Sequence, residues 1–113
     1  MGIIAVHGGL DTSRETQFME ILREAALRGY KLINNSRTKA LEAVINALEE
    51  SPKFNCGYGS VLNLNGEVEM DASIVDGALN RFSAVAAIRK VRNPISVALR
   101  LMEKTDQVIL AGR

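Results

Sequence analysis

The sequence predicts one α/β unit in which helices are layered on a sheet. Apolar residues recur at helical spacing in three segments, and strand-type runs open the chain, follow its middle and close it. The 113 residues are 47% hydrophobic and 24% charged, as in one soluble globular unit with a core. No repeat, linker or low-complexity segment divides residues 1–113. We therefore expect a single unit with the order β-α-α-β-β-β-α-β.

The first strand and the first helix are predicted from residues 2–29. Residues 2–6 form a short apolar run typical of a buried strand, and Gly8-Gly9 allows a sharp turn after it. Thr12-Ser13-Arg14-Glu15 fits a capping box, which satisfies free amides at a helix start. Gly29 is expected to end this helix. Its apolar face, which we expect to pack against a sheet, consists of Phe18, Ile21, Leu22, Ala25 and Ala26.

Two further helices are expected. Asn34-Asn35-Ser36 is a turn and cap before the second helix, which Ser51-Pro52 ends. The apolar stripe of this helix consists of Leu41, Val44, Ile45 and Leu48. Asn93-Pro94 opens the third helix, with Asn93 as the cap and Pro94 at the first position. The buried side of the third helix consists of Ile95, Ala98, Leu99 and Met102.

The remaining strands are predicted from a change of period. Residues 60–64 and 67–72 flank Asn65-Gly66, which is the strongest short signal for an antiparallel hairpin. Residues 84–91 are nearly all apolar, as expected of an interior strand covered on both faces. Residues 107–111 are expected to form the last strand.

Composition and charge exclude several classes of function. Fourteen lysines and arginines face 13 aspartates and glutamates, a net charge of +1, which disfavours a nucleic-acid or membrane-surface partner. The apolar run after Met1 is too short for a signal peptide or a membrane span, so the expected compartment is the cytoplasm. Cys56 is the single cysteine, so neither an intrachain disulfide nor a cysteine zinc site is expected.

Each candidate catalytic residue has a structural alternative. His7 precedes two glycines, where a general base would fit, but a lone histidine is more often structural. Gly8-Gly9 before a capped helix would present amides to an anion, although a full nucleotide motif is absent and a tight turn is favoured. Ser60 lacks the G-x-S-x-G order of a nucleophile elbow, and we interpret it as a strand residue.

The acidic residues and the cysteine are interpreted in the same way. Glu67, Glu69 and Asp71 alternate along a strand, as a paired-carboxylate site would require. A solvated strand face explains Glu67 and Glu69 more simply. Asp71 and Asp76 flank an apolar run and are expected to accept hydrogen bonds at turns. No charge near Cys56 in the sequence would make it a thiolate, so we assign it a packing role.

Residues 48–59 form a loop with an unusual expected backbone. The end of a helix leaves carbonyl groups without intrahelical partners, and a following loop with proline and glycine can direct more carbonyls to the same point. Such a cluster of neutral oxygens suits a hard cation. On these residues alone, a loop stabilised by its own turns and by water is favoured.

Specific motifs extend over almost the whole chain. Phe54-Asn55-x-Gly57-x-Gly59-Ser60-Val61-Leu62-Asn63 is the most specific of them. It is accompanied, in order, by residues 3–9, 40–44, 66–74, 76–77, 84–88, 93–95 and 102–105. Together these segments resemble the plant-type asparaginases, also called isoaspartyl peptidases. Phe54-Asn55 and the Asn65-Gly66 hairpin are more similar to this branch than to the related glycosylasparaginases and threonine aspartases.

The resemblance implies an N-terminal-nucleophile hydrolase with an αββα sandwich fold, made as a precursor that cuts itself. The cut frees a threonine whose α-amine, with a pKa of about 8, serves as the base for its own hydroxyl. This threonine would attack the side-chain amide of asparagine or the β-peptide bond of an isoaspartyl dipeptide. Water then hydrolyses the acyl-enzyme, and no cofactor is implied for the chemistry.

The nucleophile of this family begins a Thr-Val-Gly segment. None of the threonines of this chain is followed by Val-Gly, and these threonines are Thr12, Thr16, Thr38 and Thr105. The resemblance therefore implies that residues 1–113 are an α-subunit and that a β-subunit supplies the threonine. Two such pairs would form a dimer, and the substrate would be a small molecule.

The resemblance also implies site residues. Asn55 would hydrogen-bond near the nucleophile and the catalytic water, and the Gly8-Gly9 turn would be linked to self-cleavage. Leu10, where relatives usually carry a small residue, predicts altered cleavage kinetics. A structural sodium ion would be held by main-chain carbonyl groups, those of Leu48, Glu49, Ser51, Phe54, Cys56 and Tyr58.

Two alternatives stay open at this point. One is an enzyme of the same fold with another specificity, such as a glycosylasparaginase or a threonine-aspartase-like enzyme. The other is a non-catalytic α/β module that holds an anion at Gly8-Gly9. A Thr-Val-Gly segment encoded after Arg113 would favour the enzyme, and its absence would favour the module.

Overall fold

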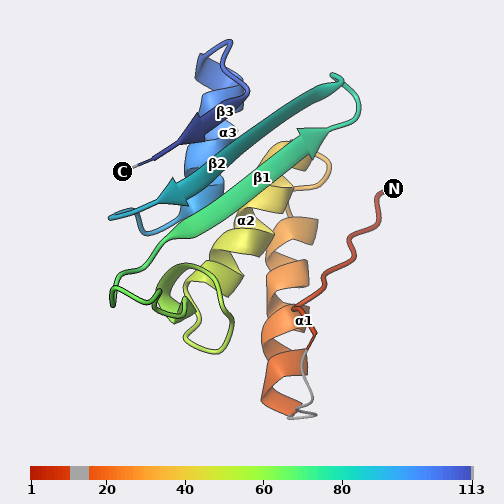
Figure 1. Cartoon of the computed structure of the whole chain (residues 1–113). Helices are drawn as coiled ribbons and strands as arrows, with labels where there is room; N and C mark the ends of the chain where they lie inside the picture. The colour runs from red at the N-terminus through yellow and green to blue at the C-terminus, as the bar shows by residue number, and fades with distance from the viewer. Residues whose placement is uncertain (11–15, 113) are drawn as a thin grey trace.

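The computed structural model describes residues 1–10 and 16–112. Their elements form a pair of helices and a three-stranded sheet that is backed by another helix (Figure 1). The elements are α1 Thr16–Tyr30, α2 Arg37–Glu49, the 3₁₀ helix η1 Gly57–Gly59, β1 Met70–Asp76, β2 Arg81–Ile88, α3 Pro94–Lys104 and β3 Ile109–Ala111. The α/β class is confirmed, and the predicted capping box at Thr12-Ser13-Arg14-Glu15 lies outside the described residues. None of the described helices is long and apolar enough to cross a membrane.

The sheet has the order β1-β2-β3, in which β1 and β2 are antiparallel and β3 runs parallel to β2. At the turn after β1, Asp76 lies opposite Arg81. The Oδ1 atom of Asp76 accepts hydrogen bonds from the backbone N–H groups of Ala78 at 3.0 Å and Leu79 at 3.3 Å. Asp76 therefore organises this turn, as predicted.

Asp71 accepts a hydrogen bond, as predicted, but it does so at a β-bulge and not at the predicted turn. The pairing of β1 with β2 shifts register between Met70 and Ala72. Opposite this shift, Ala87 has a φ of +53°, which is uncommon for a residue other than glycine. The Asp71 Oδ1 atom accepts the backbone N–H of Ala87 at 2.8 Å. The side chain thus satisfies an amide at the irregular end of the hairpin.

One hydrophobic core lies between the sheet and α3. The predicted buried side of α3 is confirmed, and it packs with β1 and β2 in a cluster of Met70, Ile74, Val85, Ile88, Ile95, Ala98, Leu99 and Met102. On the other face of the hairpin, Val75 and Phe82 are 62% and 43% exposed. β2 is the central strand of the sheet, as predicted. Among the described residues, α3 covers one face of β2 and the face that carries Phe82 is exposed, whereas the prediction has both faces covered.

A second core lies between α1 and α2. Ala25 is fully buried against a cluster that includes Val44, Leu48 and Phe54, and this cluster contains no residue of the described strands. The apolar face of α1 therefore packs on α2 and not on a sheet, contrary to the prediction. The helix ends at Tyr30, one residue after the predicted Gly29. Gly29 is buried where α1 meets α2, and a Cβ there would overlap Val44.

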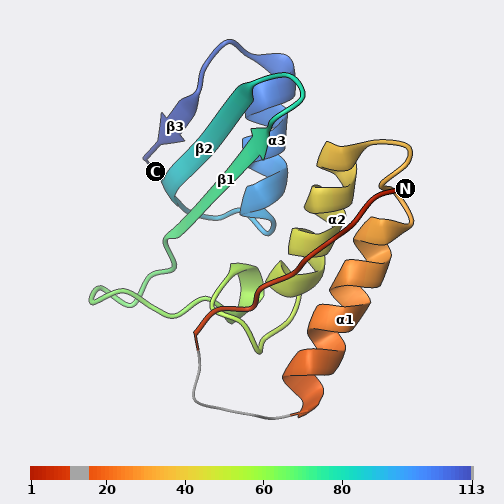
Figure 2. The same cartoon turned by 90° about the vertical axis from the view of Figure 1, so that its right-hand side faces the viewer.

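Residues 2–6 are extended but are not paired as a strand, contrary to the prediction. Figure 2 shows this segment running along α1 and α2 towards the loop that contains η1. Ile4 and Val6 are half-buried in the helix-pair core, whereas Ile3 and Ala5 are exposed. The alternation of half-buried and exposed residues is typical of a strand. A strand also needs a neighbouring strand with which to form backbone hydrogen bonds, and residues 2–6 lie against helices.

The predicted hairpin at residues 60–72 is formed only at its turn. Asn63 Oδ1 accepts the backbone N–H groups of Asn65 at 2.9 Å and Glu67 at 3.0 Å. No strand is assigned to residues 60–64, and β1 begins only at Met70 and pairs with β2 instead. β1 pairs with β2, and not with residues 60–64, because β2 and α3 together bury the apolar side of β1.

Candidate functional site

Residues 48–59, here called the glycine loop, begin where α2 ends. Glu49 is the last helical residue, and the backbone N–H of Ser51 donates to the carbonyl of Leu48 at 3.1 Å. The 3₁₀ helix η1 closes the loop, with the N–H of Gly59 donating to the carbonyl of Cys56 at 3.1 Å. The loop is therefore a compact turn that stays against the end of α2.

The glycines of η1 lie where no side chain fits. Gly57 has a φ of +53°, and a Cβ there would overlap the carbonyl oxygen of Glu49. A Cβ at Gly59 would overlap the carbonyl oxygen of Phe54 and would lie 2.9 Å from that of Ser51. These glycines therefore allow the turn to approach several main-chain carbonyl groups closely.

The carbonyl groups predicted as cation ligands all belong to the glycine loop, and they are those of Leu48, Glu49, Ser51, Phe54, Cys56 and Tyr58. The carbonyl of Phe54 accepts the N–H of Cys56 at 2.8 Å, and a carbonyl oxygen keeps a second lone pair after one such bond. The carbonyl oxygens of Glu49, Ser51 and Phe54 lie close to η1, and neutral oxygens are the ligands that a hard cation prefers. In the part of the chain that the structure describes, no group of three or more His, Cys, Asp or Glu side chains could hold a metal.

Asn55 lies in the middle of the glycine loop and is exposed. Its Oδ1 atom accepts the backbone N–H of Val61 at 3.0 Å, which ties the loop to the segment that follows it. Asn55 also lines a cavity of about 420 Å³ between the glycine loop, the start of β1 and the start of α3. The orientation of the Asn55 side chain is thus fixed by one backbone contact.

The cavity beside Asn55 has a polar lining of Glu49, Asn55, Ser60, Glu69, Asp71 and Ser73. Its described lining contains neither an imidazole nor a cationic side chain, and its polar groups are hydroxyls, carboxylates and the Asn55 amide, which can form hydrogen bonds with a ligand. The prediction that Ser60 is a strand residue is wrong. It follows η1, and its N–H donates to the carbonyl of Gly57 at 3.2 Å.

Cys56 does not carry a reactive thiolate. Burial raises the pKa of its thiol, and the nearby negative charge of Glu49 raises it further. The thiol therefore stays protonated at neutral pH, and the side chain packs at the edge of the helix-pair core. This agrees with the packing role predicted for Cys56.

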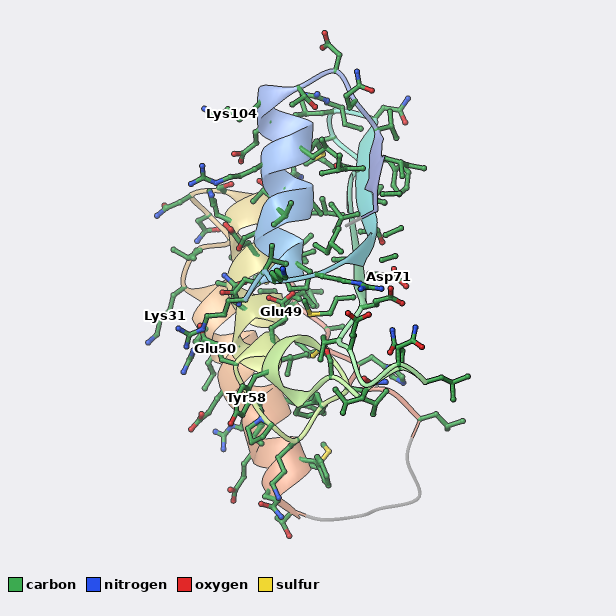
Figure 3. The ribbon with its side chains drawn as sticks, turned by 60° about the vertical axis from the view of Figure 1, so that its left-hand side comes forward. Lys31, Glu49, Glu50, Tyr58, Asp71 and Lys104 are labelled. Carbon is green, nitrogen blue, oxygen red and sulfur yellow. The ribbon has the colours of Figure 1, made fainter. Side chains whose placement is uncertain are left out.

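Sequence reasoning missed the carboxylate of Glu49, which is only 2% exposed. Its Oε1 atom accepts the backbone N–H of Ile95 and its Oε2 atom accepts Nδ2 of Asn93, both at 2.9 Å. Figure 3 shows Glu49 at the N-terminal end of α3. Burial raises the pKa of this carboxyl group above its usual range, and the two hydrogen bonds oppose that shift. The spacing in the sequence could have indicated this burial. Glu49 follows Ile45 by one helical turn, so it lies on the apolar stripe of α2.

The predicted glycine turn lies against the glycine loop. A Cβ at Gly8 would lie 2.7 Å from Cε1 of Phe54, and Gly9 has a φ of +105°. The N–H of Gly9 donates to Nδ1 of the exposed His7 at 3.2 Å. His7 therefore holds the turn, as the structural interpretation predicted. Leu10 is fully exposed.

The acidic residues before β1 form ion pairs with Arg89. Its guanidinium binds the carboxylates of Glu67 and Glu69, with Nε donating to Glu69 Oε1 at 3.0 Å. The hydrogen bond and charge of Glu69, with the charge of Glu67, raise the already high pKa of Arg89. Glu67 and Glu69 are thus ion-paired on the surface and do not form a catalytic carboxylate pair. No spacing rule links Arg89 to them, because the contact depends on how β1 pairs with β2.

Comparison with known proteins gives a family match over nearly the whole chain. A family model described as asparaginase matches residues 2–113. The plant-type L-asparaginase of Thermococcus kodakarensis is 49% identical over 117 aligned residues, which cover 99% of this chain and 38% of that protein. The isoaspartyl peptidase/L-asparaginases of Mus musculus and Homo sapiens are each 43% identical, covering 97% and 98% of this chain and 36% and 38% of those proteins. The chain thus spans little more than a third of the length of these relatives.

Proposed function

The chain belongs to the asparaginase family, and from this membership we propose that it is the α-subunit part of an L-asparaginase and isoaspartyl peptidase. Residues 1–113 would form one half of an αββα sandwich, and a β-subunit would form the other. The substrates would be asparagine and isoaspartyl dipeptides, in line with the names of the relatives.

In the proposed reaction, an N-terminal threonine outside these residues attacks the side-chain amide carbon of asparagine. Its α-amine takes the hydroxyl proton and passes it to the leaving group, so that ammonia departs and an acyl-enzyme remains. An isoaspartyl dipeptide would release an amino acid in the same step. Water then attacks the ester, which yields aspartate and restores the threonine.

The observation that carries this proposal is the way the glycine loop holds Asn55. The bond from Val61 to Oδ1 fixes the side chain beside a cavity with a polar lining. Nδ2 of Asn55 would then donate to the oxygen of the threonine or to the attacking water. A donor fixed in advance stabilises developing negative charge without having to reorganise.

The glycine loop would also hold a sodium ion through its main-chain carbonyls. Support comes from the carbonyls of Glu49, Ser51 and Phe54, which approach η1 so closely that only glycine fits there. A bound sodium ion would supply a positive charge that keeps these dipoles together. Because the ligands are main-chain atoms, side-chain changes at these positions would matter little to the ligation itself.

The proposed assembly is a dimer of αβ pairs. The pairing of one α-subunit with one β-subunit is supported by the apolar sheet face at Val75, Phe82 and Ile109, which are 62%, 43% and 59% exposed among the described residues. A sheet of the β-subunit would cover this face. Self-cleavage of the precursor would depend on the Gly8-Gly9 turn, which packs on Phe54.

The test compares two substrates with the complete, mature protein. Ammonia release from asparagine and leucine release from an isoaspartyl-leucine dipeptide are measured under the same conditions. We expect turnover of both, and the ratio of the kcat/KM values ranks the substrates. Turnover of neither substrate, with hydrolysis of sugar-linked asparagine to aspartate and an amino sugar instead, would assign the protein to the glycosylasparaginases. If the protein hydrolysed none of these compounds, the proposal that it is an amidohydrolase would be wrong.

A further inference from the structure

Glu49 joins the glycine loop to α3. Its carboxylate accepts the first-turn N–H of Ile95 and the side-chain amide of Asn93, which lie 46 and 44 residues away along the chain. A carboxylate at the N-terminal end of a helix is favoured by the free amides and by the helix dipole. The bond from Asn93 satisfies the second carboxylate oxygen.

The main chain of the same residue contacts η1. A Cβ added to Gly57 would lie 2.5 Å from Cβ of Glu49 and would overlap its carbonyl oxygen. Glu49 therefore touches the turn of the glycine loop with its backbone while its side chain is fixed to α3. It also lines the cavity beside Asn55, together with Pro94 and Ile95.

The N-terminus of α3 could be capped by a neighbouring side chain, without a carboxylate from α2. Asn93 is the N-cap residue of α3, but its side chain makes no capping hydrogen bond. Its amide instead points to Glu49, which is buried although a buried carboxylate loses its hydration. The contact thus replaces a short-range cap with one that crosses between two helices.

We propose that Glu49 is a positioning residue that fixes the glycine loop, and with it Asn55, against the N-terminal end of α3. The inference rests on the proposed function in so far as Asn55 acts in catalysis. Glu49 itself need not touch the substrate. Loss of its carboxylate would release the loop from α3 and misplace Asn55.

The test uses the complete protein and two independent measurements. One is kcat and KM for asparagine, and the other is hydrogen exchange at the amides of Cys56, Gly59 and Ser60, which close the loop. For Glu49→Ala we expect kcat to fall roughly ten- to a hundredfold with little change in KM, because a small misplacement is enough for that loss. Exchange at the three amides should rise about tenfold or more.

Glu49→Gln should restore much of both values. Glutamine can still accept from Ile95, and it can donate to Asn93 if the Asn93 amide turns over. This variant keeps the inference testable if Glu49→Ala does not fold. The matched control is Glu50→Ala, which removes an exposed neighbour that binds Arg28 at 3.6 Å and should change neither measurement. Met102→Ala, a core change on α3, serves as a control for stability alone.

The inference is overturned if Glu49→Ala leaves loop exchange at the level of Glu50→Ala. It is also overturned if Met102→Ala, at an equal loss of thermal stability, lowers kcat and raises loop exchange as much. A wild-type protein that hydrolyses neither substrate would reject the proposed function, while the exchange measurement would still decide whether Glu49 fixes the loop.

Discussion

The two polar atoms of the Asn55 side chain have different roles. Oδ1 accepts from Val61, and no described residue accepts from Nδ2, which is available for a group outside the described residues. Asn55→Asp keeps an acceptor for Val61 but removes the donor. We expect this variant and Asn55→Ala to assemble normally and to lose turnover by about tenfold or more, as when one preorganised donor is removed.

The measurement is kcat for asparagine, with size-exclusion chromatography to check assembly. Asn65→Ala, a change at an exposed asparagine in the turn before β1, is the control and should keep wild-type turnover. If Asn55→Asp retained full activity, the donor role of Nδ2 would be wrong. If only Asn55→Ala lost activity, the bond to Val61 would be the important one.

Ser83 is a fully buried residue of β2 whose hydroxyl has no hydrogen-bond partner in the part of the chain that the structure describes. A buried hydroxyl without a partner loses its hydration and gains nothing in return. Ser83→Ala should therefore leave the free energy of unfolding unchanged or raise it by up to about 1 kcal/mol. Chemical denaturation of the complete protein checks this, with the exposed Ser73→Ala as the control. A loss above about 1 kcal/mol would mean that Ser83 has a partner outside the described residues.

At the scale of an element, the glycine loop depends on its close backbone contacts. Gly59→Ala must displace the carbonyl of Phe54, whereas Gly77→Ala in the turn after β1 meets nothing within 4 Å. We expect Gly59→Ala to lower the melting temperature and to remove the stabilisation that sodium chloride gives over potassium chloride. Gly77→Ala should keep both values.

Thermal unfolding of the complete protein in the two salts measures this effect. Sodium should raise the melting temperature of the wild type, since a ligand that binds only the folded state stabilises it. Equal melting temperatures in the two salts for the wild type would contradict the sodium proposal. An unchanged Gly59→Ala variant would show that its carbonyl contacts are not needed.

The helices of this chain were predictable because their signals are local. The apolar side of α3 follows from the spacing of Ile95, Ala98, Leu99 and Met102, and Ser36 caps α2 through its hydroxyl as expected. What each helix packs against was not predictable. Gly29, for example, has the position of a helix terminator but serves the close approach of α1 to α2.

The strands were less predictable because pairing is not local. Residues 2–6 have the composition of a strand but lie on helices, and residues 60–64 lose their expected partner to β2. The turn at Asn65-Gly66 was found correctly, since it depends on neighbouring residues such as Asn63. A short signal therefore predicted the turn but not the ladder.

For the whole molecule, the site was predictable only in part. Motif resemblance singled out Asn55 and the glycine loop, and the structure brings that loop together with the start of β1 and of α3. The carboxylate of Glu49 and the guanidinium of Arg89 were missed because their partners lie on other elements.

The central claim is that these residues support a threonine that self-cleavage exposes outside them. N-terminal sequencing of the purified complete protein tests it most directly. We expect two N-termini in equal amounts, the second of which begins Thr-Val-Gly. A single uncut chain that hydrolyses asparagine at the same rate as a cleaved sample would show that no threonine freed by self-cleavage is needed.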